Sequence, residues 1–390
     1  MSVPDAEMLL ACLRLARTEG IGPVSYRRLV RTHGSVQAAL GMLERGAGSG
    51  RGIGRPCSRD DALREIEHLH AMGGRFLAHG QPGYPPLLAA LHDAPPVLAV
   101  LGDASLLSAR MVGIVGGRNA SAGGIRLAES LSALLAAHGV DTVSGLARGI
   151  DAAAHRGAMT AGRTVAAIAG GLDCPYPPEN ADLQALIART GAVVTEAPLG
   201  TMPQARHFPR RNRLIAGLGL GCVVIEAALR SGSLITARMA LDYDRTIFAV
   251  PGSPLDPRCH GSNDLLRQGA ILTENERDIL RELPETTGET GLFSYQAPTT
   301  HPPVARRVET AVQRSEAVPP PPASTPMVGE ADLHEMIEGF LSFTPSPVDD
   351  LVRRCQFSTA AVLAALSEME IAGMIEFLAG DMVVRRPPPA

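Results

Sequence analysis

The 390-residue sequence contains no lysine and no tryptophan, and aromatic residues make up only 3% of it. The basic side chains, histidine aside, are therefore all arginines. No apolar run reaches the roughly 18–20 residues that a membrane-spanning helix needs, and the first residues lack the basic-then-apolar pattern of an export signal. We expect a cytoplasmic protein with no membrane association.

Several chemical signatures are also missing. The six cysteines are scattered without a C-x-x-C pair, which argues against a structural zinc site or a disulfide framework. No G-x-S-x-G turn, Walker loop or metal-spaced set of histidines and acids occurs, so hydrolase and NTPase readings have no support. We expect neither a metal nor a cofactor.

The net charge of −4 conceals an uneven distribution of charge along the chain. The first 270 residues carry 27 arginines against 22 acidic residues, whereas residues 271–390 carry 9 against 18. A polyanionic partner should therefore be bound by the first 270 residues, with the acidic C-terminal part pointing elsewhere.

Residues 1–75 are predicted to form a small helical domain. Two apolar-periodic segments are joined by the turn Gly20-Ile21-Gly22-Pro23, which is similar to a helix-hairpin-helix of the SAM-like kind. The backbone N–H groups of such a turn can bind a nucleic-acid phosphate. The same residues equally suit a plain helical hairpin with no ligand.

Residues 76–283 are predicted to form an α/β domain. Short apolar runs alternate with helical segments, which is typical of βαβ units and a doubly wound, Rossmann-like parallel sheet. The predicted strands are residues 111–115, 140–144, 164–169, 192–195, 222–226 and 246–250, with 270–272 as a possible edge strand. The predicted helices are residues 123–138, 150–161, 181–190, 209–217 and 233–243.

Two further segments complete the chain. Residues 284–330 are proline-rich and predict a linker. Residues 331–390 predict three helices and a hairpin about Gly380-Asp381, an arrangement that resembles a winged helix. The third of these helices contains no arginine, although it is the one with which a DNA reader would contact bases. A protein-interaction role is therefore favoured for this module.

The predicted strands end in small and basic residues. Ligands of open parallel sheets bind at the carboxyl ends of the strands, and helix N-termini surrounded by guanidinium groups attract phosphates. Tight strand-to-helix turns also use glycine without any ligand. Five such turns on one edge favour a phosphate-binding surface. The turns hold Gly116, Gly117 and Arg118; Ser144, Gly145 and Arg148; Gly170 and Gly171; and Ser231, Gly232 and Ser233.

The stretch from Arg206 to Leu218 brings four arginines to the start of a predicted helix. A helix N-terminus is the positive end of the helix dipole, so cations are disfavoured there unless a negative ligand joins them. Arg206, Arg210 and Arg213 should share one helical face. Some of these arginines should pair with Glu196, Glu226 or Asp173, but they outnumber the nearby acids.

The sequence argues against a dinucleotide site, because the first turn lacks the G-x-G-x-x-G spacing and the second strand ends in Ser144 and not in an acidic residue. Asp151 and His155 lie four residues apart on one helical face and could in principle be catalytic. We favour a structural role for both, with Asp151 capping or pairing with an arginine and His155 packed in the interior.

Taken together, these motifs closely resemble the DNA processing protein A family, also called DprA or Smf. The resemblance rests on segments such as VGIVGGR (112–118), VSGLARGIDAAAH (143–155), FPRRNRLIAGL (208–218) and VIEAALRSGSLITARMA (224–240). Gly117 stands where the family usually has serine, which removes a hydroxyl from the phosphate pocket but leaves Arg118 in place.

The resemblance implies a non-enzymatic protein that binds single-stranded DNA, protects incoming DNA during natural transformation and helps to load the RecA recombinase. It also implies a homodimer formed through the Rossmann domain, and we expect the contact near residues 270–272. The alternative is a nucleotide-cleaving, phosphoribohydrolase-like enzyme with Glu226 and Asp151 as its acids. The resemblance and the strand ends together assign DNA or phosphate binding to Gly116, Gly117, Arg118, Ser144, Gly145, Arg148, Phe208, Arg210, Arg211, Asn212, Arg213, Ser231, Gly232 and Ser233.

Overall fold

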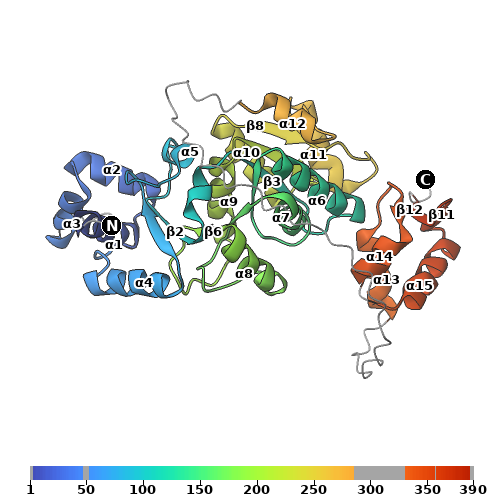
Figure 1. Ribbon diagram of the computed structural model, residues 1–390, viewed down its shortest axis with the longest axis horizontal. Coiled ribbons are helices and arrows are strands. Elements are labelled where there is room, and N and C mark those ends of the chain that lie inside the picture. The colour runs from blue at the N-terminus through green and yellow to red at the C-terminus, as the bar shows by residue number, and fades with distance from the viewer. Residues whose placement is uncertain (1–2, 47–51, 285–329, 356, 387–390) are drawn as a thin grey trace, which may run out of the picture.

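A nine-stranded sheet forms the centre of the protein (Figure 1). The computed structural model describes residues 3–46, 52–284, 330–355 and 357–386. The strand order is β1-β2-β6-β5-β4-β3-β7-β8-β9, with parallel pairing from β6 through β9 and antiparallel pairing of β1 with β2 and of β2 with β6. The strands are β1 (Arg75–Ala78), β2 (Val97–Gly102), β3 (Met111–Gly116), β4 (Asp141–Ser144), β5 (Thr164–Ala167), β6 (Ala192–Thr195), β7 (Gly221–Ile225), β8 (Thr246–Ala249) and β9 (Ile271–Leu272).

The predicted Rossmann-like fold is confirmed. All seven predicted strands occur within two residues of their expected ends. The antiparallel strands β1 and β2 were not among them. β1 is only four residues long and has one exposed and one half-buried side chain, so it carries little apolar periodicity.

Helices cover both faces of the sheet, as expected for a doubly wound domain. One face packs against α9 and α10, and the other against α6, α7 and α12. The helices of this domain are α5 (Pro86–Ala89), α6 (Ala122–Ala137), α7 (Ile150–Ala161), α8 (Ala181–Thr190), α9 (His207–Leu218), α10 (Gly232–Asp242), α11 (His260–Arg267) and α12 (Glu276–Glu282).

The strand order reverses between β3 and β7. From β3 the chain runs outward through β4, β5 and β6, then returns to β7 on the other side of β3 and continues to β8 and β9. The loops after β3 and β7 therefore diverge from a common point, which leaves a crevice at the carboxyl ends of these two strands.

The N-terminal helical domain packs directly against the sheet. It consists of α1 (Val3–Ala16), α2 (Pro23–His33), α3 (Val36–Glu44) and α4 (Arg59–Ala71). Buried side chains of these helices, including Leu13 and Leu69, share one hydrophobic cluster with Val97, Ile168 and Val193 of the sheet region. The helices and the sheet are therefore held by one continuous core, and the helical domain is not simply tethered.

The C-terminal module has the winged-helix arrangement predicted for it (Figure 1). Its elements are α13 (Glu330–Phe340), β10 (Ser346–Pro347), α14 (Val348–Cys355), α15 (Thr359–Ile371), β11 (Ile375–Leu378) and β12 (Met382–Arg385). The hairpin turns at Gly380 and Asp381, both of which have positive φ. The predicted linker lies almost wholly outside the described residues.

Close packing of α6 against α7 depends on Gly157. A Cβ atom at this position would lie 2.7 Å from the backbone Cα and carbonyl carbon of Glu129, and backbone atoms cannot move aside as a flexible side chain can.

We expect Gly157→Ala to lower the free energy of unfolding by about 1–3 kcal/mol, because the added methyl group forces the two helices apart. Urea denaturation measures the effect. Gly123→Ala in α6 is the matched control, since the nearest atom to its new methyl group is the Ser121 hydroxyl oxygen at 3.6 Å; it should not destabilise the protein. Equal stability of both variants would contradict this account of the packing.

Candidate functional site

A cavity of about 910 Å³ opens at the point where the strand order reverses. Its walls are the loops that follow β3, β4 and β7, together with the first turn of α9 and the start of α10. The predicted site residues that line it are Gly116, Gly117, Arg118, Arg148, Phe208, Arg211, Asn212, Ser231, Gly232 and Ser233. The structure thus brings ten residues from four separate segments to one cavity.

Arg211 is a fixed cation at the base of this cavity. Its side chain is buried, with the residue only 5% exposed, and Nη1 donates hydrogen bonds to the carbonyl oxygens of Gly145 and, at 2.6 Å, Ala167. Burial lowers the pKa of Arg211 to about 10, an effect that the nearby Asp151 carboxylate partly offsets. The guanidinium therefore remains charged at neutral pH, and its Nε has no hydrogen-bond partner among the described residues.

Two residues make the burial of Arg211 possible. A Cβ atom on residue 145 would lie within 2.7 Å of the guanidinium atoms of Arg211, so glycine leaves the space that this group occupies. Asp151 supplies the opposite charge, and burial raises the pKa of its carboxyl while Arg211 acts in the opposite direction. The Asp151 carboxyl accepts a hydrogen bond from the Ala147 N–H at 3.4 Å and interacts with Arg211 electrostatically, without a direct ion pair to an arginine among the described residues.

The outer part of the cavity carries cations that are free to meet a ligand. Arg118 is exposed, lies over the ring of Phe208 at 5.3 Å, and forms no salt bridge with any described residue. Arg148 is 61% exposed, with only a long contact of 3.4 Å to Glu179. The Phe208 ring also approaches the Tyr176 ring, with 5.7 Å between their centroids.

Helix N-termini add further positive potential. Neither α9 nor α10 has an acidic residue in its first turn. Ser231 caps α10, accepting a hydrogen bond from the Ser233 N–H at 3.3 Å, and the two hydroxyls lie 2.6 Å apart. Hydroxyls, guanidinium groups and unopposed helix dipoles together create a site for an anion.

Four predicted residues do not line this cavity. Ser144 is fully buried and donates to the Ile114 carbonyl oxygen at 2.6 Å, and Gly145 lies behind Arg211. Arg213 is buried and pairs with Glu196, and it also donates to the Asp93 carbonyl oxygen at 2.7 Å. Arg210 is 62% exposed and lines a neighbouring cavity instead.

The expectation that some arginines of this stretch pair with nearby acids is confirmed for Arg213, which pairs with Glu196 and is not available to a ligand. The segments that carry Asp93 and Glu196 cover the second turn of α9 and pair with Arg213 there. Helical spacing predicts which side chains share a direction, but it cannot show where a loop from another part of the chain covers them.

Sequence reasoning also missed several lining residues, among them Asn119, Tyr176 and Arg258. Arg258 comes from a short 3-10 helix (Pro257–Cys259), is paired with Asp256 at 2.8 Å, and donates to the carbonyl oxygens of Gly339 and Leu341 in the C-terminal module. No local pattern marks such residues, because their position depends on contacts far apart in the sequence.

The three groups considered for catalysis are held in structural contacts. Burial lowers the pKa of His155 to about 3, and its Nδ1 lies 2.8 Å from the Thr164 hydroxyl, away from the cavity lining. Glu226 does line the cavity, but its carboxylate accepts from the Ser121 N–H at 2.7 Å and from the Ser121 hydroxyl at the start of α6. Asp151 neighbours Arg211.

Two further features are absent from the described residues. No helix in the described ranges is long and apolar enough to cross a bilayer. Within the same ranges, no group of three or more histidine, cysteine or acidic side chains is placed to hold a metal ion.

Family models match three parts of the chain. The family described as DNA recombination-mediator protein A matches residues 75–284. A DprA-like N-terminal HHH domain matches residues 6–67, and a DprA winged helix domain matches residues 316–381.

Individual proteins are similar to this chain over half of its length or more. The DNA processing protein DprA of Bacillus subtilis is 45% identical over 204 residues, which cover 52% of this chain and 69% of that protein. A putative DNA processing protein DprA of Mycobacterium tuberculosis is 34% identical over 364 residues, 89% of this chain and 87% of that protein. The X-ray structure of DprA from Streptococcus pneumoniae aligns with a TM-score of 0.61 at 33% identity, covering 73% of this chain and all of that one.

The fold is that of a Rossmann-like protein with a helix-hairpin-helix domain and a winged helix, and the family matches place it among proteins of DNA processing and recombination. Within that class, the chain belongs to the DNA recombination-mediator protein A family, DprA.

The electrostatic attraction between the buried Arg211 guanidinium and the Asp151 carboxyl makes a prediction about stability and pH. Removing the cation leaves the buried carboxyl without its compensating charge, so Arg211→Met should lower the free energy of unfolding by about 3–5 kcal/mol at neutral pH. The folded-state pKa of Asp151 is already raised and should rise further without the guanidinium. The folded variant then binds more protons than the unfolded chain, so its stability should fall as pH increases above about 4, the ordinary pKa of aspartate.

Denaturation of Arg211→Met across a pH series measures this dependence. The double variant Arg211→Met, Asp151→Asn is the control, because it lacks the titrating group and should lose the additional fall in stability. Identical pH profiles for the single and double variants would contradict an electrostatic interaction between Arg211 and Asp151.

Proposed function

We propose that this protein binds single-stranded DNA in the cavity where the strand order reverses. The observation that carries the proposal is that one cavity is lined by four arginines, Arg118, Arg148, Arg211 and Arg230. The helices α9 and α10, which begin at this cavity, have no acidic residue in their first turns to offset that positive charge. The guanidinium group of arginine can donate two parallel hydrogen bonds to one phosphate, which suits binding to a phosphate backbone.

The depth of the site favours a single strand over a duplex. Arg211 lies at the base of the cavity, 5.9 Å from the centroid of the Phe208 ring, whereas Arg118 and Arg148 lie further out. A flexible strand can bring successive phosphates to cations at different depths. The Phe208 and Tyr176 rings offer faces on which an unpaired base can stack, and a base in a duplex is already stacked on its neighbours.

The predicted residues divide into two roles within this proposal. Arg118, Arg148, Arg211, Asn212, Phe208 and the turns at Gly116–Gly117 and Ser231–Ser233 would meet the strand. Ser144, Gly145 and Arg213 would support the site from behind, because they are buried in contacts with Ile114, Arg211 and Glu196 respectively. Sequence reading is too local to draw this distinction.

The wider role follows from the family resemblance. We propose that the protein acts in the cytoplasm, protects incoming single-stranded DNA during natural transformation, and helps to load the RecA recombinase onto it. We also propose a homodimer through the Rossmann domain. The edge strand β9 supports that position for the contact, because β9 ends the sheet and Leu272 is exposed there.

The competing interpretation is a phosphoribohydrolase-like enzyme with Glu226 as its acid. The contacts of Glu226 favour the binding interpretation, since both carboxylate oxygens are engaged by Ser121 at the N-terminus of α6. A carboxylate used as a helix cap is less available to a substrate.

We expect Arg118→Ala to weaken binding of oligothymidylate by about tenfold, because it removes a charge-assisted contact at the rim of the cavity. Fluorescence anisotropy across a salt series measures both the affinity and the dependence of log K on log[salt]. The slope of that dependence should decrease by the amount expected for the loss of about one phosphate contact. Arg189→Ala on α8 is the matched control, because Arg189 is equally an exposed arginine but does not line the cavity.

Three outcomes would contradict the proposal. Wild-type binding that shows no salt dependence would exclude a phosphate-driven interface. Equal or tighter binding of a duplex of the same sequence would exclude the single-strand preference. Turnover of a nucleoside monophosphate that Glu226→Gln abolishes would establish the enzyme instead.

A further inference from the structure

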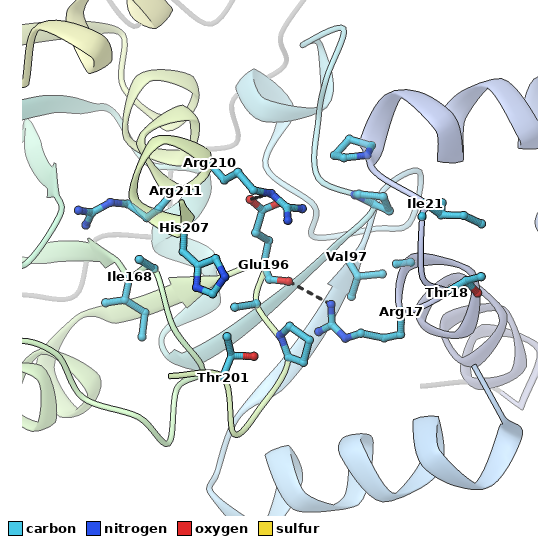
Figure 2. A pocket seen from close by; sticks show the side chains of 17 residues that line it. Arg17, Thr18, Ile21, Val97, Ile168, Glu196, Thr201, His207, Arg210 and Arg211 are labelled. Atoms are coloured by element: carbon cyan, nitrogen blue, oxygen red, sulfur yellow. Dashed lines mark hydrogen bonds and ion pairs between the residues drawn. The ribbon is translucent and has the colours of Figure 1, made fainter. Parts of the chain in front are cut away.

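A second cavity, of about 290 Å³, lies between the N-terminal helical domain and the sheet (Figure 2). One wall is the glycine turn that joins α1 to α2, and the opposite wall is the first turn of α9. The segment after β6, from Glu196 to Thr201, borders it as well. The cavity therefore belongs to neither domain alone.

The two domains hold this cavity in a defined shape. Arg17, which directly follows α1, donates to the Glu196 carbonyl oxygen at 3.0 Å and pairs with Glu65 at 2.9 Å. Glu65 also accepts from the Leu199 N–H at 3.4 Å. These contacts join the helical domain to the segment after β6, and the hydrophobic core beneath them is continuous. The shape of the cavity is therefore fixed by contacts between the two domains.

Basic side chains surround the cavity and outweigh the one acid in it. Arg17, His207, Arg210 and Arg211 line it, with Glu196 as the only acidic residue of the lining. Figure 2 shows Glu196 lying between Arg17 of the helical domain and Arg210 of α9. Glu196 is paired with Arg213 behind it and lies 3.9 Å from Arg210, and Arg17 is paired with Glu65. The lining arginines that keep donors for a ligand are Arg210, whose side chain is 62% exposed, and Arg211, whose Nε has no partner among the described residues.

The glycine turn brings the N-terminus of α2 to the edge of the same space, where Gly20, Ile21 and Pro23 line the cavity. α2 begins at Pro23 with Gly22 as its N-cap, without a side-chain cap and without an acidic residue in the first turn. The helix carries Arg27, Arg28 and Arg31 and no acid, so nothing in its own sequence balances the positive end of its dipole. An external anion would do so.

The two cavities share the first turn of α9. Arg211 lines both of them, while Phe208 and Asn212 face the first and His207 and Arg210 face the second. A strand lying across this turn would meet cations on both sides of it. The second cavity also has apolar walls, including Ile21, Val97 and Ile168, against which a sugar or base can pack.

We propose that the interdomain cavity is a second subsite for the same single strand, in which the helix-hairpin-helix turn and α9 bind the phosphates that follow those in the first cavity. This inference rests on the proposed function, because the strand must first occupy the cavity at the strand reversal. It assigns the glycine turn of the helical domain to DNA and not to a plain hairpin.

The direction of the strand is consistent with the charges on either side of the first cavity. On one side lies the helical domain with the basic α2. On the other lies the C-terminal module, whose α14 begins with Asp349 and Asp350, and Asp350 pairs with Arg126 of α6. A polyanion leaving the first cavity is attracted toward the helical domain and repelled from the acidic start of α14.

Thr201 provides a specific test. It lines the second cavity and not the first, is half-buried, and its hydroxyl makes no hydrogen bond to a described residue. Thr201→Glu places a negative charge in the second cavity, and Thr201→Gln adds nearly the same volume without charge. Binding is measured for oligothymidylates of about 4 and about 20 nucleotides, a range that spans one and several binding units.

The ~20-mer should bind Thr201→Glu about tenfold more weakly than Thr201→Gln, with a smaller salt slope, because at least one phosphate contact is lost. The ~4-mer should bind both variants equally, since it can be held by the first cavity alone. Arg118→Ala, measured in parallel, should weaken binding of both oligonucleotides.

A second variant protects the test against misfolding. Gly22→Asp supplies an N-cap to α2, which favours the helix, and a Cβ atom at this position meets no atom within 4 Å. Gly22→Asn is its neutral control, since asparagine caps equally well. We expect Gly22→Asp to bind the ~20-mer several-fold more weakly than Gly22→Asn, with melting temperatures no lower than that of the wild type.

The outcomes separate this inference from the proposed function. If Thr201→Glu and Gly22→Asp bind the ~20-mer as well as their neutral controls while Arg118→Ala binds it weakly, the second subsite is excluded and the proposed function stands. If the wild type binds neither oligonucleotide, the proposed function fails and the second subsite fails with it.

Discussion

The burial of the Arg211 guanidinium at the carboxyl edge of the sheet is the interaction on which the rest of the site depends. Transfer of a cation out of water costs several kcal/mol, which is offset only where hydrogen bonds and an opposite charge surround it. Carbonyl oxygens at the ends of β4 and β5 and the carboxyl of Asp151 provide that environment. Residue 145 must then be glycine, and the first turn of α9 is fixed against two strand ends. The Phe208 ring, which follows from the same turn, is held over the guanidinium groups of Arg118 and Arg211.

Much of this architecture was predictable because it is local. Apolar runs and helical periodicity placed the strands from β3 to β9 and the helices from α6 to α10, and the rule that ligands bind at carboxyl strand ends gathered the turn residues. The directions of individual arginines on α9 were not predictable. Arg213 faces inward because it pairs with Asp93 and Glu196. These two acids come from segments more than 100 residues apart, so no local pattern reveals the pairing. Arg258 lines the cavity from a short helix that has no periodic signal.

The C-terminal module contacts the Rossmann domain without using the helix that a DNA-reading winged helix would employ. Its contacts run through the carbonyl oxygens of Gly339 and Leu341, which accept from Arg258, and through Asp350, which pairs with Arg126. Arg258 lines the first cavity, so part of the positive charge there is satisfied by the module and not by a ligand. The acidic C-terminal part of the chain therefore limits the basic surface on one side and leaves it open on the other.

The same argument explains why cations are tolerated at the start of α9. A helix that begins with arginines and has no acid in its first turn is unfavourable by itself. α2 likewise lacks a side-chain cap and an acid in its first turn, although its arginines lie further along the helix. At α6 and α4, by contrast, carboxylates meet the positive end of the helix, since Glu226 contacts the start of α6 and Asp60 and Asp61 lie in the first turn of α4. The first turn of α9 instead borders both cavities, and the turn that precedes α2 borders the second. Neither α9 nor α2 has an acidic residue in its first turn, and their N-termini border adjoining cavities. A single phosphate backbone lying across α9 would bring negative charge to both helix N-termini.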